Sequence, residues 1–227
     1  MSSPQTLKIL ASTELFSSLP PESLDAIAAQ GIERTYKKGQ ILFSAGDEGD
    51  SLFVVLEGAV KGYATADDGT ELIVGIFEPP SIFGEVAVGD GGPRSATIEV
   101  VAPTRVFILA RSRFLAALGK HRELVEAYIA QLAAMIRSLQ TKTESLVFLD
   151  LQGRVAKLLL ELLADRSADG RSLDLNMTQG ELASMVGGSR PSVNQVLKTL
   201  EGRGYIAIDG KQVIINDIDS LRRLSTT

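Results

Sequence analysis

The sequence predicts an α+β protein with an N-terminal antiparallel β-roll, a long central helix and a C-terminal winged helix-turn-helix. Three observations carry this prediction. Short runs rich in Val, Ile, Phe and Tyr alternate with Gly and Asp turns over residues 33–110. A stretch without Pro or Gly follows over about residues 122–147. Beyond it, two capped helical patterns meet at Gly187-Gly188.

The N-terminal part is expected to hold two short helices within residues 6–30, the second beginning at Pro20-Pro21. The alternating runs then predict strands over residues 40–44, 51–57, 59–64, 71–77, 96–101 and 105–109. Ser112 is expected to cap a helix over residues 113–118, which Gly119 ends. We assign residues 1–120 to this domain, 121–148 to the central helix and 149–227 to the C-terminal domain.

A heptad pattern runs through the central stretch. Apolar residues recur every seven positions, at Val125, Leu132, Leu139 and Leu146. A second set follows the first three of these by four positions and consists of Ile129, Ile136 and Thr143. Leu at one seam position and β-branched residues at the other favour a parallel two-stranded coiled coil. The sequence therefore predicts a homodimer joined through the central helix. The alternative is a long amphipathic helix packed on its own β-roll.

The C-terminal part begins with a cap at Asp150 and a helix to about Ala164, followed by a polar loop over residues 165–172. Thr178 and Glu181 form a capping box for the first helix of a pair, and Ser189 caps the second. A hairpin with Asp209-Gly210 at its turn follows, as expected of a winged helix.

Composition limits the classes of function. The 227 residues include no Cys and one His, His121. An iron–sulfur cluster or thiolate zinc site is therefore excluded, and neither haem nor another metal is expected. No apolar run reaches the roughly 18 residues of a membrane span, and no signal pattern is present, so we expect a cytoplasmic protein without membrane contact. No nucleophile–base pair stands out, so no enzyme activity is expected.

Charge is unevenly distributed. The net charge of −5 divides into −6 over residues 1–150 and +1 over residues 151–227. A near-neutral domain can still bind nucleic acid where its basic residues share one face.

The stretch around Gly84 and Arg94 has the properties of an anion site. Gly84 frees the backbone at the start of a turn. Arg94 supplies a permanent charge and a fork of donors that suits phosphate, and Ser95 adds a hydroxyl. Glu85 fits if it accepts hydrogen bonds from sugar hydroxyls. Taken alone, the glycines favour a Gly-rich hairpin with an exposed Glu–Arg pair.

Phe83-Gly84-Glu85, followed by Pro93-Arg94-Ser95-Ala96-Thr97, resembles the phosphate-binding cassette of the cyclic-nucleotide-binding domains. With residues 148–156 and 187–201, the chain resembles the cyclic-AMP receptor (catabolite activator) family of bacterial transcription regulators over roughly residues 10–220. The resemblance implies cyclic AMP, or another cyclic nucleotide, as effector. It also implies a dimer that binds near-palindromic double-stranded DNA and recruits RNA polymerase as an activator. The implied effector residues are Gly84, Glu85, Val86, Ala87, Arg94 and Ser95.

The chain departs from the family pattern on the central helix. That family presents two adjacent hydroxyl residues to the base, and counting from Arg94 and Asp150 places Leu139 and Gln140 there. Gln140 can donate and accept hydrogen bonds, whereas Leu139 can do neither. Cyclic GMP, a cyclic dinucleotide and regulation without any ligand therefore remain as alternatives.

A second departure lies in the recognition helix. Arg190 matches the family's first guanine-reading Arg, Pro191 replaces an acid, and Gln195 replaces a second Arg. Gln suits adenine better than guanine, so we expect a related but different operator. The expected DNA contacts are Thr178, Gln179, Ser189, Arg190, Pro191, Ser192, Asn194, Gln195 and Lys198. Of these, Ser189, Ser192 and Lys198 are better placed for backbone phosphates.

A kinase regulatory subunit or a channel gate would share the phosphate cassette. Neither needs a helix-turn-helix, so residues 178–215 argue against both.

Overall fold

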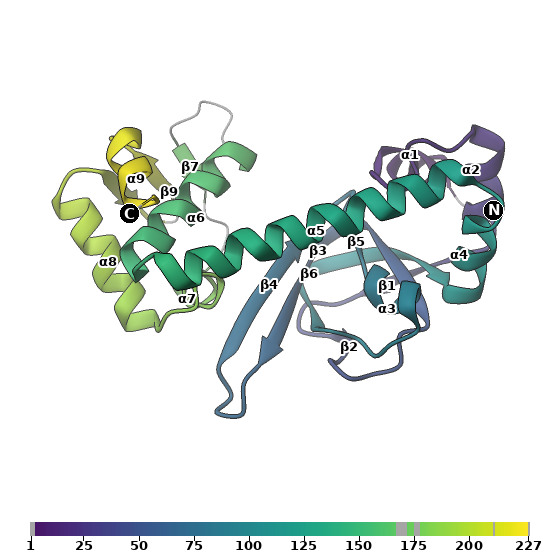
Figure 1. The fold of residues 1–227 in the computed structure, drawn as a ribbon, viewed down its shortest axis with the longest axis horizontal. Helices are drawn as coiled ribbons and strands as arrows, with labels where there is room; N and C mark the ends of the chain where they lie inside the picture. Colours follow the sequence, from purple (N-terminus) through teal and green to yellow (C-terminus); the bar gives the residue numbers. More distant parts are fainter. Residues whose placement is uncertain (1–2, 167–171, 175–177, 211, 227) are drawn as a thin grey trace. The chain divides into compact units, whose positions relative to one another are not determined.

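The computed structural model describes residues 3–166, 172–174, 178–210 and 212–226 (Figure 1). It forms two compact units, Met1–Arg137 and Ser138–Thr227, and the long helix α5, Arg122–Phe148, runs from the first into the second. Each unit has its own apolar core. The predicted α+β class is confirmed. Within the described ranges, no helix is long and apolar enough to cross a membrane.

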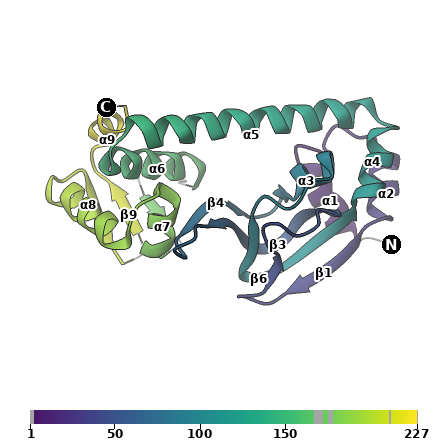
Figure 2. The same ribbon diagram turned by 60° about the horizontal axis from the view of Figure 1, so that its bottom comes forward.

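The first unit is an antiparallel sheet with helices at one end (Figure 2). The strands run in the order β1-β6-β3-β4, with β2 paired to β6 and β5 to β3. Their bounds are β1 Ile32–Tyr36, β2 Ile41–Phe43, β3 Ser51–Thr65, β4 Glu71–Phe77, β5 Ile82–Phe83 and β6 Thr97–Ala110. The helices are α1 Pro4–Ser12, α2 Pro21–Ala28, α3 Glu85–Asp90 and α4 Arg111–Leu118.

Two predicted strand pairs are single long strands. Residues 51–57 and 59–64 belong to β3, and residues 96–101 and 105–109 belong to β6. The pairing register of β3 with β6 shifts around Gly58, which has a φ of 81°. A Cβ at position 58 would lie 2.1 Å from the Pro103 carbonyl oxygen. Gly58 therefore carries a bulge within a continuous strand, where the sequence suggested a turn.

Three further details of the first unit differ from the prediction. The strands β1 and β5 had not been predicted. Residues of β1 are mostly exposed and show no alternation of burial, and β5 has only two residues. The prediction that Ser112 caps α4 was wrong, because the helix begins at Arg111 with Ala110 as its N-cap.

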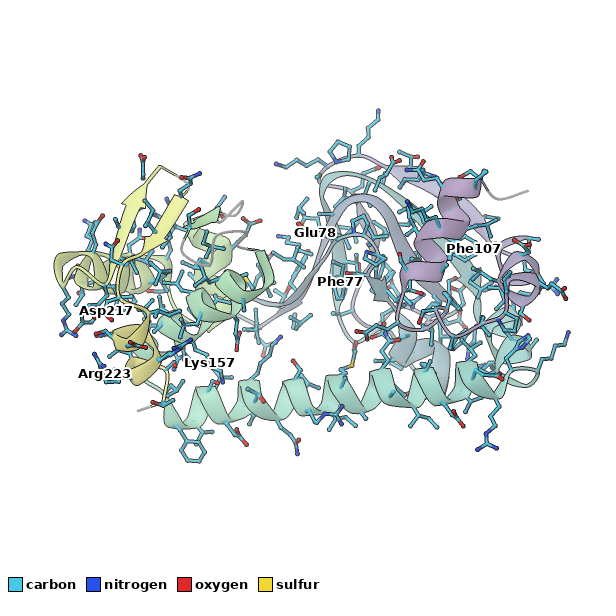
Figure 3. All side chains as sticks on the ribbon, turned by 90° about the horizontal axis from the view of Figure 1, so that it is seen from above. Phe77, Glu78, Phe107, Lys157, Asp217 and Arg223 are labelled. Carbon is cyan, nitrogen blue, oxygen red and sulfur yellow. The ribbon has the colours of Figure 1, made fainter. Side chains whose placement is uncertain are left out.

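Two clusters form the core of this unit. One joins the helices to one face of the sheet and includes Phe107, Phe114, Leu124 and Tyr128 (Phe107 is labelled in Figure 3). The other fills the opposite face; its buried members are Phe53, Val55, Val60, Phe83, Ile98, Val100 and Val106. The second cluster includes Phe83 of β5, the strand that leads through Gly84 into α3, and so anchors the start of that helix.

The second unit confirms the winged helix-turn-helix. Its helices are α6 Leu151–Arg166, α7 Gln179–Val186, α8 Arg190–Gly202 and α9 Ile218–Leu224, and β7 Ser172–Asp174, β8 Ile206–Asp209 and β9 Gln212–Ile215 form a sheet in the order β7-β9-β8. The short β7 and α9 had not been predicted, and most of the predicted loop over 165–172 lies outside the described residues. Asp209 pairs with Gln212, so the hairpin loop begins at Gly210, one residue later than predicted.

The predicted caps of this unit are confirmed. An Asp150 Oδ1 accepts from the Gly153 N–H at 2.7 Å. Thr178 and Glu181 form both bonds of the capping box, and Ser189 accepts from the Ser192 N–H. Asp217 caps α9 in the same way, and hydrogen bonds from Ser220 lower the pKa of its carboxyl group (Asp217 is labelled in Figure 3).

Candidate anion cradle and nucleic-acid interface

The backbone of the cradle is shaped by Gly84, between β5 and α3. Gly84 has a φ of 80°, and a Cβ there would lie 2.6 Å from Arg94 Nη1. Only glycine suits both constraints. Opposite, the Arg94 N–H donates to the Asp47 carbonyl at 2.8 Å, and the Gly46 N–H donates to the Arg94 carbonyl at 2.9 Å. The loop before β3 and the segment before β6 therefore hold each other in place.

The Arg94 side chain is buried, with 4% of the residue's surface exposed. Its Nη1 donates to the carbonyl oxygens of Ser51 at 2.8 Å and Gly84 at 3.2 Å. The guanidinium carbon lies 4.2 Å from the ring centroid of Phe43. Burial lowers the pKa of this guanidinium, and the nearby carboxylates of Asp50, Asp47 and Glu85 oppose that effect. These contacts fix the orientation of the guanidinium.

One edge of the Arg94 guanidinium remains open. Among the described residues, its buried Nε has no hydrogen-bond partner. Its Nη2 has the Oδ1 of Asp50 at 3.7 Å, which is too long for a hydrogen bond. Because Nε and Nη2 lie on the same edge, this edge offers the parallel pair of donors that binds a phosphate through two oxygens.

The carboxyl group of Glu85 lies in the same cradle. The residue is 5% exposed, and burial raises the pKa of its carboxyl group, while a backbone hydrogen bond and the charge of Arg94 partly counter this. A buried carboxyl group in this position is suited to accept hydrogen bonds from neutral hydroxyls. The residues of the cradle thus fit a phosphate joined to a sugar: Arg94 suits the phosphate and Glu85 suits a sugar hydroxyl.

The structure places the other predicted cradle residues on the same two segments. Val86 is half-buried and Ala87 buried in the first turn of α3, and Ser95 is exposed beside Arg94. Two contacts that the sequence did not reveal hold α3 from its other side. Arg111 Nε donates to the Val88 carbonyl at 2.9 Å, and the Tyr128 hydroxyl donates to the Glu85 carbonyl at 2.8 Å.

The two predicted base contacts, Leu139 and Gln140, are exposed residues of the second unit. Their part in an effector site stays a prediction. Leu139 also belongs to the predicted dimer seam. The seam residues Ile129, Ile136, Leu139 and Leu146 are each more than half exposed. A different face of α5, with Leu124 and Tyr128, packs into the core of the first unit. Of the other seam residues, Leu132 is half-buried against that core and Val125 is half-buried as well, so the exposed apolar part of the seam is the four residues just named.

The recognition helix α8 divides into two faces. Val193, Leu197 and Leu200 are buried in the core of the second unit. The exposed residues of the helix include five that were predicted to contact DNA, namely Arg190, Pro191, Ser192, Gln195 and Lys198. This is the arrangement of a helix that presents polar side chains to a groove.

The remaining predicted DNA contacts have other positions. Thr178 and Gln179 are exposed at the start of α7, where the Thr178 hydroxyl is already used by the capping box. Ser189 is exposed at the start of α8, and its hydroxyl lies 2.7 Å from that of Ser192. Asn194 is half-buried, and within the described part of the chain its Oδ1 is buried without a partner. Asn194 Oδ1 is therefore less accessible to DNA than the exposed side chains of α8 are.

Two cations of α6 bond to neighbouring segments of the second unit. Arg154 donates from Nη1 to the Leu149 carbonyl at 2.9 Å and from Nε to the Val186 carbonyl at 2.8 Å. Lys157 Nζ lies 2.6 Å from Ser145 Oγ on α5 (Lys157 is labelled in Figure 3). No sequence pattern indicated these bonds, which connect residues up to 32 positions apart.

A phosphate-type cradle in an antiparallel β-roll, followed by a long helix and a winged helix-turn-helix, defines the class of effector-responsive DNA-binding transcription regulators. Comparison with family models agrees. Residues 33–121 match the model of the cyclic nucleotide-binding domain, and residues 153–224 match that of the Crp-like helix-turn-helix domain. The chain belongs to the cyclic-AMP receptor family of transcription regulators.

Individual relatives cover almost the whole chain. It is 33% identical over 220 residues to the CRP-like cAMP-activated global transcriptional regulator of Mycobacterium tuberculosis, covering 95% of this chain and 98% of that one. The c-di-GMP-responsive global regulator CLP of Xanthomonas campestris has a TM-score of 0.76 at 25% identity, with coverage of 86% and 99%. FixK2 of Bradyrhizobium japonicum has a TM-score of 0.78 at 22% identity and coverage of 87% and 98%, which shows the shared fold.

Proposed function

We propose that this protein is a homodimeric, sequence-specific regulator whose DNA binding is controlled by a cyclic nucleotide, with cyclic AMP as the first candidate. The observation that carries the proposal is the edge of the buried Arg94 guanidinium that bears Nε and Nη2, since neither nitrogen has a hydrogen-bond acceptor within range among the described residues. Similarity to a relative named for activation by cyclic AMP supports the same effector.

In this proposal each cradle residue has a distinct role. Arg94 and Ser95 hold the cyclic phosphate, because charged and hydroxyl donors suit its oxygens. Glu85 accepts from the ribose hydroxyl. Gly84 lets the backbone come close, and Val86 and Ala87 line the wall beside it. The base is assigned to Leu139 and Gln140 by resemblance to the family, with Gln140 supplying the polar contact.

The exposed seam of α5 is proposed to join two copies, since a coiled coil would cover its apolar residues. The functional parts are then residues 1–120 for the effector, 121–148 for dimerisation and 149–227 for DNA. Two recognition helices related by a two-fold axis bind a near-palindromic site with half-sites about one helical turn apart. We further propose that the DNA-bound dimer recruits RNA polymerase in the cytoplasm, and that neither a metal nor catalysis is needed.

Calorimetric titration with cyclic AMP, cyclic GMP and a cyclic dinucleotide tests the effector. We expect cyclic AMP to bind the wild-type protein. Arg94→Leu should weaken binding by at least about tenfold, because each hydrogen bond to a charged group contributes roughly 1.5–3 kcal/mol. Arg122→Leu is the matched control, since Arg122 is exposed and pairs only with Glu126 among the described residues. Unchanged affinity in a folded Arg94→Leu protein would remove the cradle from the proposal.

A second candidate has a specific observation in its favour. Leu139 cannot hydrogen-bond to a base. The cradle around Arg94 suits the phosphate of any cyclic nucleotide, whereas Leu139 contributes no hydrogen bond that would select adenine. The similarity to a regulator named as c-di-GMP-responsive points to a cyclic dinucleotide. Tight binding of the dinucleotide with no binding of cyclic AMP in the same titration would establish this alternative.

A further inference from the structure

Three acidic side chains act on the charge of the Arg94 guanidinium. Asp50 Oδ1 lies 3.7 Å from Arg94 Nη2, and the side chain of Asp50 is 81% exposed. The charges of Asp47 and Glu85 also act on the Arg94 guanidinium; Asp47 Oδ2 accepts from the Ser44 N–H at 2.7 Å, and Glu85 is buried in the same cradle. A ligand that pairs with Arg94 must therefore enter a site that holds one cation and three acids.

Asp50 differs from the other two acids in its position and freedom. Its Oδ1 accepts a hydrogen bond from Ser51 Oγ at 2.6 Å, and its backbone carbonyl accepts from the Arg111 N–H at 2.7 Å. The backbone is thus fixed, while the exposed carboxylate stands at the edge where a phosphate oxygen would bind. It repels any anion there, and its exposure weakens the repulsion through solvent without removing it.

The repulsion depends on the charge of the ligand. The phosphodiester of a cyclic nucleotide carries one negative charge. Opening that ring by hydrolysis gives a phosphomonoester with the same base and sugar, and its second ionisation has a pKa near 6, so it carries about two charges at neutral pH. A fixed charge acts on a dianion with twice the energy with which it acts on a monoanion. If Asp50 weakens binding of the diester by a given factor, it therefore weakens binding of the monoester by the square of that factor.

We propose that Asp50 is a specificity-determining residue of the cradle, which disfavours nucleoside monophosphates relative to cyclic nucleotides through charge. The inference rests on the proposed cyclic-nucleotide site and names what that site rejects.

Asp50→Asn is the variant that tests this role. Asn keeps the oxygen that accepts from Ser51 and leaves the backbone carbonyl in place, so only the charge is removed. Asp67→Asn is the matched control, because it removes the same charge from an exposed loop beyond Thr65, at the end of β3 opposite Ser51. Adenosine, cyclic AMP and AMP provide charges of zero, one and about two in a competition assay against a fluorescent cyclic nucleotide at fixed pH and salt.

We expect Asp50→Asn to leave adenosine unchanged, to strengthen cyclic AMP by about threefold and to strengthen AMP by about ninefold, the size that an exposed charge pair allows. Equal gains for all three ligands, or for cyclic AMP and AMP alike, would mean that Asp50 acts by occupying space, and would overturn the proposal. A uniform loss would do the same, because Asp50 would then orient Arg94. If AMP displaces the probe from neither protein, a gain for cyclic AMP without a gain for adenosine supports the charge effect, and no gain overturns it. Failure of cyclic AMP to bind even the wild-type protein is a separate result, which refutes the proposed effector.

Discussion

The hydroxyl of Tyr128 on α5 donates a hydrogen bond of 2.8 Å to the backbone carbonyl of Glu85, the first residue of α3. A Cβ at Gly89 would lie 2.0 Å from this hydroxyl, so only glycine permits the contact. The ring of Phe114 packs edge-on against Tyr128, with centroids 5.3 Å apart. Because α3 borders the cradle and α5 carries the predicted dimer seam, this bond connects the two.

Tyr128→Phe should separate nucleotide binding from its effect on DNA. The variant keeps the ring and removes the donor, and burial raises the pKa of the Tyr128 hydroxyl, so the group is protonated at physiological pH. We expect nucleotide affinity to stay within about fivefold, since the bond contributes about 1 kcal/mol to the position of α3. The factor by which nucleotide strengthens operator binding should fall. Both affinities are measured by fluorescence anisotropy.

Tyr36→Phe, which removes a hydroxyl from β1, is the control for that measurement. Coupling is reciprocal, so operator DNA should also strengthen nucleotide binding less in Tyr128→Phe than in the wild-type protein. An unchanged coupling factor in both directions would show that Tyr128 only packs.

Burial of Glu85 predicts a pH dependence of stability. Its pKa is raised in the folded protein, so the folded state takes up a proton more readily than the unfolded state, and stability falls as pH rises from the unfolded pKa near 4.5 through the raised folded value. Glu85→Gln removes this penalty. Its melting temperature should exceed that of the wild-type protein at pH 7, and the difference should vanish near pH 4.

In the same thermal scans, Glu33→Gln is expected to change the melting temperature at pH 7 in the opposite direction. Burial would raise the pKa of Glu33, but hydrogen bonds from Thr6 and Arg105 together with the charge of Arg105 lower it. Its ionised form therefore stabilises the fold above pH 4.5, and this contribution is lost as pH falls through the lowered value. Glu33→Gln should thus melt below the wild-type protein at pH 7. A Glu85→Gln protein that also melts lower at pH 7 would contradict the argument.

Local signals in the sequence predicted the helix starts well. The capping residues Asp150, Thr178 and Ser189 act on N–H groups within three positions of themselves, so their spacing is visible in the sequence. Ser112 was misassigned because Arg111 already continues from β6 into α4. The N-cap of α4 depends on where β6 ends, and the end of β6 is set by its pairing with β3, which reaches Ala110.

The site was predictable only in part for the same reason. Gly84 and Arg94 lie in one recognisable stretch. Asp50 lies 44 positions from Arg94 and Tyr128 lies 43 from Glu85, and folding alone brings these pairs together. In the sequence, Asp50 was one of several acids in a turn, and Tyr128 was one of several core residues on a helix.

Operator specificity gives a test of α8. Gln195 is exposed on the face opposite Val193 and Leu197. Gln195→Arg should shift the preferred base at one position of each half-site from adenine toward guanine, by ~1–3 kcal/mol. Selection from a randomised operator library measures this. Lys198→Gln is the contrast, because loss of a phosphate contact should weaken all sequences alike and reduce the salt dependence. A uniform loss for Gln195→Arg would show that Gln195 does not read a base.

Leu139 decides between a ligand-driven switch and a dimer that is active without ligand. More than half of this side chain is exposed in the single chain, in line with Ile136 and Leu146. Covering a Leu in a dimer seam stabilises it by up to ~1.5–3 kcal/mol, whether or not nucleotide is present. A hydroxyl residue at the same place would leave the unliganded seam weaker, and a bound base would then contribute more to closing it.

Leu139→Thr should therefore lower DNA binding without ligand and raise the fold-stimulation by cyclic AMP. A ligand shifts an equilibrium only by its differential affinity for the two states, so a seam that is already closed leaves cyclic AMP little to add. The measurement is operator binding with and without nucleotide, at one salt concentration, for both proteins. Leu72→Thr, an exposed apolar residue of β4, controls for general loss of apolar surface. The wild-type protein could instead be inert on DNA until nucleotide is added, with Leu139→Thr behaving in the same way. The seam at Leu139 would then not stabilise the DNA-binding state, and control of DNA binding would rest on the cradle alone.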